Sequence, residues 1–359
     1  MDMKLVVATP LYPPEGGGPA TYAKALEDEL PGRGWDVELV KFRDVRHWPK
    51  GIRHCAYAWR VYRAARQGDM VIVLDPVSTG IPALIAAKLA RKPFFVRVAG
   101  DYAWEQGTQR FHVREVLDEF VMRSDYALPV RVMKWMQTLV ARNAVRVIVP
   151  SEYLKRIVVA WGIPADKIRV VYNAAPTIAE VAEAPVSGEY IVSIARLVPW
   201  KGMDILIRAV GRTKNTRLII VGGGPERAKL EGIVDNLDLR NRVTFTGNLP
   251  HEETLAYLAH ATAYVLNTRY EGLSHLILEA MALHVPVATT PLGGNPELIE
   301  DEVTGLLFPY GDVAAIEAVI ERMQSDAPLR KKLADAAYEK ANTFTRERMI
   351  SDSLAALTL

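Results

Sequence analysis

Two carboxylates eight positions apart, Glu271 and Glu279, have the residue type and spacing best suited to chemistry in this chain. They lie in residues 268–282, TRYEGLSHLILEAMA, directly after a short apolar run. Ser274 is a favourable helix N-cap, so Glu271 falls on a loop and Glu279 falls inside the helix that follows. Carboxylates accept hydrogen bonds from pairs of sugar hydroxyls. The segment therefore predicts a ligand that carries a sugar at each end of a diphosphate.

The start of the same helix offers a place for the phosphates, because its first N–H groups have no partner within the helix. The residues expected around that position are Gly272, Leu273, Ser274, His275 and Leu276. For Glu279 the alternative is an exposed helix residue. Its immediate neighbours are apolar, however, so we expect it near a buried face, where a carboxylate needs partners.

Two cations, Arg196 and Lys201, follow the apolar run 190–195 on a predicted loop. Arginine can make paired contacts to a phosphate, and lysine acts as a point charge. A diphosphate would be held well by both side chains at the carboxyl end of a strand. The alternative is two solvated surface cations.

Three glycine-rich turns also follow predicted strands, at residues 13–19, 221–226 and 291–297. Glycine lets the backbone approach a ligand closely. The first turn carries Gly16, Gly17 and Gly18 ahead of a helix whose N-terminus suits an anion. The alternative for each turn is ordinary strand-to-helix turn chemistry. None of them reads G-x-G-x-x-G, which disfavours a dinucleotide cofactor and an oxidoreductase.

Short β-branched runs alternate with amphipathic segments along the whole chain, which predicts parallel sheets covered by helices on both faces. The strands expected in the first half are 5–8, 37–41, 70–74, 94–98, 145–149 and 168–171. Those expected in the second half are 190–195, 217–221, 243–246, 264–267, 287–290 and 306–308. Residues 174–188 lack periodicity and read as a linker, and 346–359 read as a last amphipathic helix. The fold class is therefore α/β, with two facing Rossmann-like doubly wound domains and a cleft between them.

Composition narrows the class of protein further. The chain has one cysteine, Cys55, so it forms no intrachain disulfide and no cysteine-based metal site. No apolar run reaches the roughly 20 residues of a membrane span, and we expect no signal peptide. Residues 41–66 carry eight Lys and Arg residues and a single acidic residue, Asp44. Aromatic side chains are interleaved with them, at Trp48, Tyr57, Trp59 and Tyr62.

With these motifs in this order, the chain resembles the retaining glycosyltransferases of family 4, which have the GT-B architecture. The resemblance covers nearly the whole chain. It rests on the first glycine loop, Arg196 with Lys201, the Glu271-x7-Glu279 pair and Gly-Gly-x-x-Glu at 293–297. It implies an acceptor-binding domain over 1–178, completed by a C-terminal helix over 343–359. It also implies a nucleotide-sugar donor domain over 186–342.

The resemblance implies roles for the site residues. Arg196 and Lys201 would neutralise the diphosphate as it leaves, Glu271 would contact the transferred sugar and Glu279 the ribose. Glycines 16–18 would close over the phosphates, and the base would lie near Gly223 and Asn248. The sugar, expected to be a hexose, would be transferred with retention and without a protein nucleophile. Family members need no metal or other cofactor, which agrees with the absence of Asp-x-Asp here.

The chain departs from the family pattern at three positions. Members commonly have a histidine after the fourth strand, where this chain has Asp101, and Asp101 is expected to take that role or the role is absent. His275 stands where an apolar residue is common and would add a donor beside the phosphates. His284 stands where glycine is frequent and is interpreted as structural.

The partners are less constrained than the fold. The donor would be GDP-mannose or a UDP-sugar, and the acceptor a glycan or a polyprenyl-linked or other lipid-linked molecule. We expect segment 41–66, with 131–142, to touch an anionic membrane surface, from a cytoplasmic protein on its inner face. The alternative is two ordinary surface helices with buried aromatic faces. No nucleic-acid partner is expected. Other functions left open are a non-catalytic nucleotide-sugar-binding subunit and a different sugar-nucleotide enzyme such as an epimerase.

Overall fold

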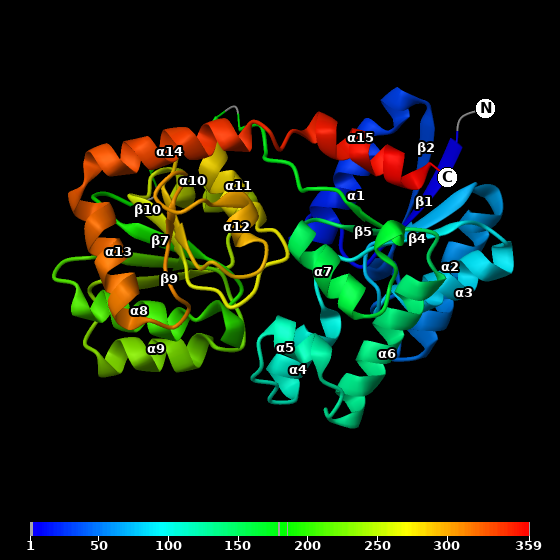
Figure 1. Ribbon diagram of the computed structural model, residues 1–359, viewed down its shortest axis with the longest axis horizontal. Helices are drawn as coiled ribbons and strands as arrows, with labels where there is room; N and C mark the ends of the chain where they lie inside the picture. Colours follow the sequence, from blue (N-terminus) through cyan, green and yellow to red (C-terminus); the bar gives the residue numbers. More distant parts are fainter. Residues whose placement is uncertain (1–2, 179, 185, 359) are drawn as a thin grey trace. The chain divides into compact units, whose positions relative to one another are not determined.

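The computed structural model describes residues 3–178, 180–184 and 186–358. The chain divides into two compact units, coloured in chain order in Figure 1. The first unit combines Met1–Asn173 with Arg346–Leu359, and the second is Ala174–Thr345. Between residues 171 and 190 the described part of the chain contains no helix or strand, which agrees with the predicted linker at 174–188.

The first unit is built on a six-stranded parallel sheet, because its strands are apolar on both faces and need helices on each side. In spatial order the strands are β2 (Trp35–Lys41), β1 (Met3–Thr9), β3 (Met70–Val73), β4 (Phe94–Arg97), β5 (Val147–Val149) and β6 (Ile168–Val170). The strand order changes direction at β1, so right-handed crossovers place α1 on one face and α2 and α3 on the other.

The helices of this unit connect its strands in turn. They are α1 (Gly18–Glu29), α2 (Ile52–Gln67), α3 (Gly80–Ala90), α4 (Tyr102–Arg110), α5 (Leu117–Met122), α6 (Leu128–Asn143), α7 (Glu152–Ala160) and α15 (Arg346–Leu357). Short 3-10 turns add η1 (Pro31–Arg33), η2 (Phe42–Asp44) and η3 (Ala165–Lys167).

The second unit repeats the design with a second six-stranded parallel sheet. Its strands in spatial order are β12 (Leu306–Leu307), β11 (Val287–Thr289), β10 (Ala263–Leu266), β7 (Ile191–Ile194), β8 (Leu218–Val221) and β9 (Val243–Gly247). Its helical segments are η4 (Pro199–Lys201), α8 (Met203–Arg212), α9 (Arg227–Asn236), α10 (His251–Ala259), α11 (His275–Ala282), α12 (Asn295–Leu298), α13 (Val313–Ser325) and α14 (Ala327–Ala341).

The predicted α/β class with two Rossmann-like doubly wound domains is confirmed. Each of the twelve strands expected from the sequence is present, with ends that differ by at most two residues. The last predicted helix is also present, as α15.

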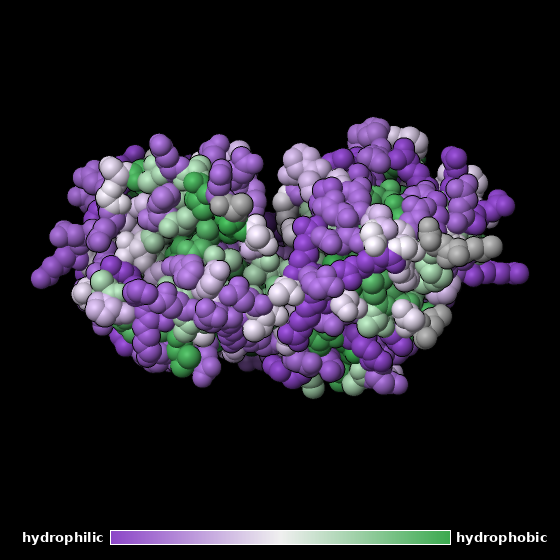
Figure 2. All heavy atoms as spheres, turned by 90° about the horizontal axis from the view of Figure 1, so that it is seen from above, coloured by the Kyte–Doolittle hydropathy of each residue, from purple (hydrophilic) through white to green (hydrophobic). Residues whose placement is uncertain are grey.

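The surface is mixed. Figure 2 shows one face on which hydrophilic side chains dominate and hydrophobic ones form separate patches. Among the described residues, no helix combines the length and apolar character needed to cross a bilayer.

The C-terminal helix α15 belongs to the first unit because it packs against α1. The Tyr22 hydroxyl of α1 and the Ser353 hydroxyl of α15 share a hydrogen bond of 2.7 Å, and both residues are fully buried. At the surface, Arg346 of α15 pairs with Asp28 at 3.1 Å and with Glu29 at 2.9 Å.

We predict that Tyr22→Phe destabilises the first unit by about 1 kcal/mol, the usual net worth of a buried hydrogen bond. Urea unfolding followed by tryptophan fluorescence measures this change. Ser353→Ala is the matched variant, and combining the two should cost little more than Tyr22→Phe alone because both remove the same bond. Fully additive effects would mean that the two hydroxyls act independently.

Candidate functional site

The candidate site lies in the second unit, at the carboxyl edge of its sheet. Parallel strands end at the same edge, so the loops that follow β7, β8, β10 and β11 start there together. These loops carry Arg196 and Lys201, the glycine-rich turns at 221–226 and 291–297, and the segment that contains Glu271.

An ion pair joins two of the predicted residues. The Lys201 ammonium donates to Glu271 Oε1, and their side chains are only 13% and 17% exposed. The pair brings together two loops that are 70 residues apart in the chain. A cation and a carboxylate in contact, both mostly withdrawn from water, interact more strongly than a surface pair does.

The turn that presents Lys201 is anchored to the residues after β10. The Arg269 N–H donates to Trp200 O at 2.8 Å, and Asn267 Nδ2 donates to Gly202 O at 2.8 Å. Gly202 has φ 47°, and a Cβ placed there would lie 2.4 Å from Asn267 Nδ2. Glycine is therefore required at this position for the Lys201 turn to meet the Glu271 loop.

Arg196 is exposed on the loop after β7. In the part of the chain that the structure describes, its guanidinium has no hydrogen bond or ion pair. Its loop is held by the next glycine turn, since Leu197 N donates to Gly223 O at 3.0 Å. Arg196 is thus an exposed cation with no partner among the described residues, whereas Lys201 is paired with Glu271.

The glycine turns serve as close-packing points between loops. A Cβ on Gly223 would lie 3.0 Å from Asn248 Oδ1, which places these two predicted residues side by side. Gly294 N donates to Glu271 O at 2.9 Å, and a Cβ on Gly294 would lie 2.2 Å from Gly272 O. The loop at 293–294 therefore supports the loop that carries Glu271.

Ser274 caps α11 as predicted, because its hydroxyl accepts from Ile277 N at 3.3 Å. Leu273 and Gly272 are buried beside the cap, while His275 and Leu276 are half-buried in the first turn. His284, just past the end of this helix, has φ 54° and stacks on Tyr338, with ring centroids 3.8 Å apart. A residue of left-handed conformation ends the helix there, so His284 has the structural role expected for it.

Glu279 is buried with fewer interactions to offset the cost of its burial than the other charged residues of the site. Its side chain is 13% exposed, and its Oε2 has no hydrogen-bond partner among the described residues. Burial raises the pKa of Glu279 to about 7. His251 Nε2, at the start of α10, lies 3.9 Å from Glu279 Oε1.

Tyr264 of β10 relates the two carboxylates to each other. Burial, and then the charges of Glu271 and Glu279, raise the pKa of its phenol well above the ordinary value. Glu271 lies on the loop after β10 and Glu279 lies in the helix α11 that follows it, as the sequence predicts.

Asp101 belongs to the first unit and occupies a different environment. It is fully buried and caps α4 by accepting from Trp104 N at 2.9 Å. Its other oxygen accepts from Gln137 Nε2 at 3.0 Å and from Trp161 Nε1 at 3.1 Å. Burial raises the pKa of Asp101. These contacts give Asp101 a structural role, and a role at a sugar stays a prediction.

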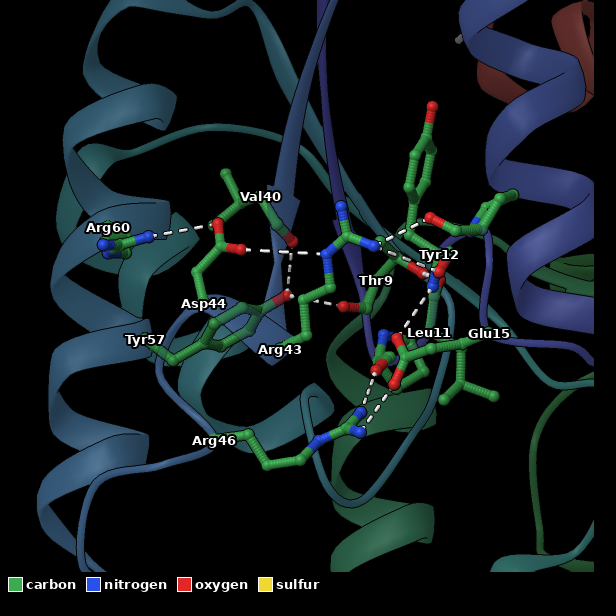
Figure 3. Close-up of polar contacts among 12 residues, drawn as sticks. Thr9, Leu11, Tyr12, Glu15, Val40, Arg43, Asp44, Arg46, Tyr57 and Arg60 are labelled. Atoms are coloured by element: carbon green, nitrogen blue, oxygen red, sulfur yellow. Dashed lines mark hydrogen bonds and ion pairs between the residues drawn. The ribbon is translucent and has the colours of Figure 1, made fainter.

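The glycine loop of the first unit is also away from the ion pair in sequence and lies after β1 (Figure 3). Gly17, with φ 129°, precedes the first residue of α1, and Gly16 and Gly17 are exposed while Gly18 is half-buried. Two arginines of the predicted basic segment, Arg43 and Arg46, donate to this loop.

Sequence reasoning missed His251 as a neighbour of Glu279, because the two residues are on different helices. It also missed the loop contacts of Arg43 and Arg46. Among the described residues, no group of three or more His, Cys, Asp or Glu side chains is arranged to hold a metal ion.

Comparisons with known proteins point to one family. Residues 17–174 match the family model described as a glycosyl transferase 4-like domain, and residues 175–340 match that described as glycosyl transferases group 1. The lipopolysaccharide core biosynthesis glycosyltransferase LpsD of Rhizobium meliloti is 34% identical over 182 residues, covering 50% of this chain and 52% of LpsD. The chain thus spans about half the length of the first curated relatives it matches.

Two further proteins extend the comparison. A GDP-mannose-dependent alpha-(1-6)-phosphatidylinositol monomannoside mannosyltransferase of Mycolicibacterium smegmatis is 37% identical over 147 residues, 38% of each chain. The crystal structure of HepE from Anabaena, in complex with UDP and glucose, superposes with a TM-score of 0.75 and 19% identity. It covers 99% of this chain and 100% of HepE, and at this identity the likeness concerns the fold.

We predict that Glu279→Gln stabilises the protein at pH 8, by up to about 3 kcal/mol. A carboxyl whose pKa is raised to about 7 by burial disfavours the folded state once it ionises. The penalty is absent below its unfolded pKa near 4.5 and complete above about 7. The gain should therefore shrink as the pH falls from 8 towards 4.5, which urea unfolding at several pH values measures.

Glu271→Gln is the matched control, since it leaves Lys201 without its carboxylate and should destabilise rather than stabilise. A Glu279→Gln protein that is less stable than the wild type at pH 8 would contradict the assigned environment of Glu279.

Proposed function

Because the chain belongs to the family-4 glycosyltransferases with the GT-B fold, we propose that it transfers a sugar from a nucleoside-diphosphate sugar to an acceptor. The observation that carries the proposal is the contact between Lys201 and Glu271, with Arg196 exposed on the neighbouring loop. Two cations and two carboxylates at one sheet edge match the charges and hydroxyls of such a donor. We further propose that the sugar is a hexose and that its anomeric configuration is retained.

Each site residue would bind a different part of the donor. Arg196 and Lys201 would bind the diphosphate, together with the N–H groups at the start of α11. Glu271 would accept hydrogen bonds from the transferred sugar, and Glu279 from the ribose hydroxyls. The poor compensation of Glu279 supports this assignment, because hydroxyl donors would supply the hydrogen bonds that it lacks.

The transfer reaction requires electrostatic stabilisation of the leaving group. As the bond between the sugar and the diphosphate breaks, negative charge accumulates on the phosphate oxygens. Fixed cations in a partly dehydrated site stabilise that charge more than they stabilise the ground state. We propose that Arg196 and Lys201 do this without a metal ion and that no protein nucleophile takes part. The acceptor oxygen would form a bond to the anomeric carbon as the bond from that carbon to the diphosphate oxygen breaks, and the hydroxyl proton would pass to the departing diphosphate.

The names of relatives suggest donor and acceptor classes. The mannosyltransferase of Mycolicibacterium smegmatis depends on GDP-mannose and acts on a phosphatidylinositol mannoside, and LpsD takes part in lipopolysaccharide core synthesis. We propose that this chain uses GDP-mannose or a UDP-sugar and glycosylates a glycan or a lipid-linked acceptor. Gly223 and Asn248 would lie beside the base.

A membrane-bound acceptor fits the character of two helices of the first unit. Neither α2 nor α6 contains an acidic residue, whereas α2 has four arginines and α6 has Arg131, Lys134 and Arg142. Trp59 of α2 is 59% exposed and Trp135 of α6 is 62% exposed. Of the aromatic side chains predicted to be interleaved with the cations, Tyr57 of α2 is buried, whereas Trp59 is exposed.

Helix α3 joins these two helices into one layer, since it packs against both. It contains no acidic residue and leaves Ile85 and Leu89 exposed. Exposed apolar side chains among cations are the features by which a protein surface binds anionic lipid. We propose that this layer rests on an anionic membrane from which the acceptor is taken.

The first experiment separates binding from turnover. Arg196→Ala should weaken binding of the preferred nucleoside diphosphate by on the order of tenfold or more, the cost of losing charge-assisted hydrogen bonds. Glu271→Gln should keep that binding but lose most turnover at saturating donor. Thermal shift with a panel of nucleotides identifies the base, and calorimetry measures the affinities.

Lys214→Ala is the control, because Lys214 is an exposed lysine of the same unit. No thermal shift with any nucleotide would contradict the proposal. Near-normal turnover of Glu271→Gln would show that Glu271 is not at the reacting sugar. Nucleotide binding without turnover for any acceptor would favour a non-catalytic binding subunit.

The second experiment tests the membrane surface by sedimentation with vesicles. The wild type should be enriched on vesicles of phosphatidylcholine with phosphatidylglycerol over phosphatidylcholine alone. Trp59→Ser with Trp135→Ser should reduce this binding by on the order of a hundredfold or more, because each buried tryptophan contributes a few kcal/mol. Leu237→Ser, at an exposed leucine of the second unit, should have no effect. Equal binding to neutral and anionic vesicles would exclude the proposed surface.

A further inference from the structure

The glycine loop of the first unit has to be held in place by something other than packing. Gly16 and Gly17 are exposed, and a Cβ on Gly16 would meet no atom within 4 Å. Glycines also have more backbone freedom to lose than any other residue. A loop of this composition keeps one shape only if neighbouring groups fix its backbone.

Arg43 supplies one such restraint from η2. Its Nη1 donates to Pro13 O at 2.7 Å, with Tyr12 O at 3.5 Å (Figure 3). Lys41 also contacts Tyr12, because its Nζ lies 3.6 Å from the centroid of the Tyr12 ring. Tyr12 OH in turn donates to Glu27 of α1. The first half of the loop is thus held between η2 and α1.

Arg46 supplies the other restraint and spans the loop. Its Nη2 donates to Pro10 O at 3.1 Å, and its Nη1 donates to Glu15 Oε1 at 2.5 Å. The second oxygen of Glu15 accepts from Tyr12 N at 3.3 Å. One guanidinium therefore links the beginning of the loop to the residue just before Gly16 (Figure 3).

The segment that carries both arginines is attached to α2. Asp44 of η2 pairs with Arg60 of α2 at 3.2 Å. The buried Tyr57 hydroxyl donates to Val40 O at 2.9 Å and lies 3.5 Å from Thr9 O, which ties α2 to the ends of β2 and β1. Arg43 and Arg46 therefore reach the loop from a segment that is itself bonded to its neighbours.

We propose that Arg43 and Arg46 are positioning residues that hold the glycine loop, residues 10–18, in a shape that binds phosphate. The inference rests on the proposed function for its donor. It also divides the basic segment 41–66 in two. Arg43 and Arg46 serve the loop, and Arg63 and Arg66 stay on the exposed side of α2.

An isolated surface ion pair such as Arg46–Glu15 is worth little by itself. What distinguishes these arginines is that they bond to three loop carbonyls, at Pro10, Tyr12 and Pro13, as well as to the carboxylate. Removing a guanidinium would leave these carbonyls to water and free the loop to sample other conformations.

The test reads loop order and catalysis separately. In Arg43→Met and Arg46→Met, the amides of Tyr12 and Glu15, which donate to groups of the loop, should exchange hydrogen on the order of tenfold faster, as expected for one or two lost hydrogen bonds. The donor KM should rise by a similar factor while kcat changes little. Arg110→Met, at an exposed arginine at the end of α4, should leave both unchanged. Reversing the pair, Glu15→Arg with Arg46→Glu, should slow the exchange relative to Arg46→Glu alone.

Unchanged exchange in both methionine variants would overturn the proposal, and so would faster exchange without a change in KM. If Arg46→Met does not fold, Arg46→Lys replaces it, because lysine keeps the charge but cannot bond to Pro10 and Glu15 at once. Exchange is measured on the free protein, so it remains informative if the wild type turns over no donor. That last outcome would instead contradict the proposed function.

Discussion

Parallel pairing of the strands is the constraint on which the rest of this structure depends. All strands of a parallel sheet end at the same edge, so the loops that follow them begin as neighbours however far apart they are in the chain. In the second unit this edge brings the loop of Lys201 against the loop of Glu271 across 70 positions of sequence. The glycines at 202, 223 and 294 then let these loops touch backbone to backbone.

The site that results is unevenly balanced in charge. Lys201 and Glu271 compensate each other, whereas Arg196 is left in solvent and Glu279 is left with an unbonded oxygen. A protein selected for stability alone would have little reason to keep a carboxyl with its pKa raised to about 7 by burial. Such groups concentrate where a ligand completes the set of partners. The ends of the site that lack partners are those that a ligand would have to satisfy.

The fold could be predicted from sequence because strands buried on both faces are nearly continuous apolar runs, and β3 and β8 show this plainly. The pairing of loops followed from the same rule. Contacts between separate elements could not be predicted in this way. His251 faces Glu279 from another helix, and Arg46 reaches Pro10 and Glu15 through a backbone path that only the folded chain defines. Asp101 could have been recognised as a cap, since it stands three residues before Trp104 at the start of a helix.

The sharing of the first unit between the two ends of the sequence affects how the chain can fold during synthesis. Tyr22 and the buried face of α1 pack against Ser353 and α15. These C-terminal residues leave the ribosome only after the whole second unit has been made. Until then the outer side of α1 exposes apolar surface, and a nascent first unit is incomplete however well its sheet is formed. The second unit can mature as a continuous stretch of chain. The first unit can be completed only after the second unit has been synthesised.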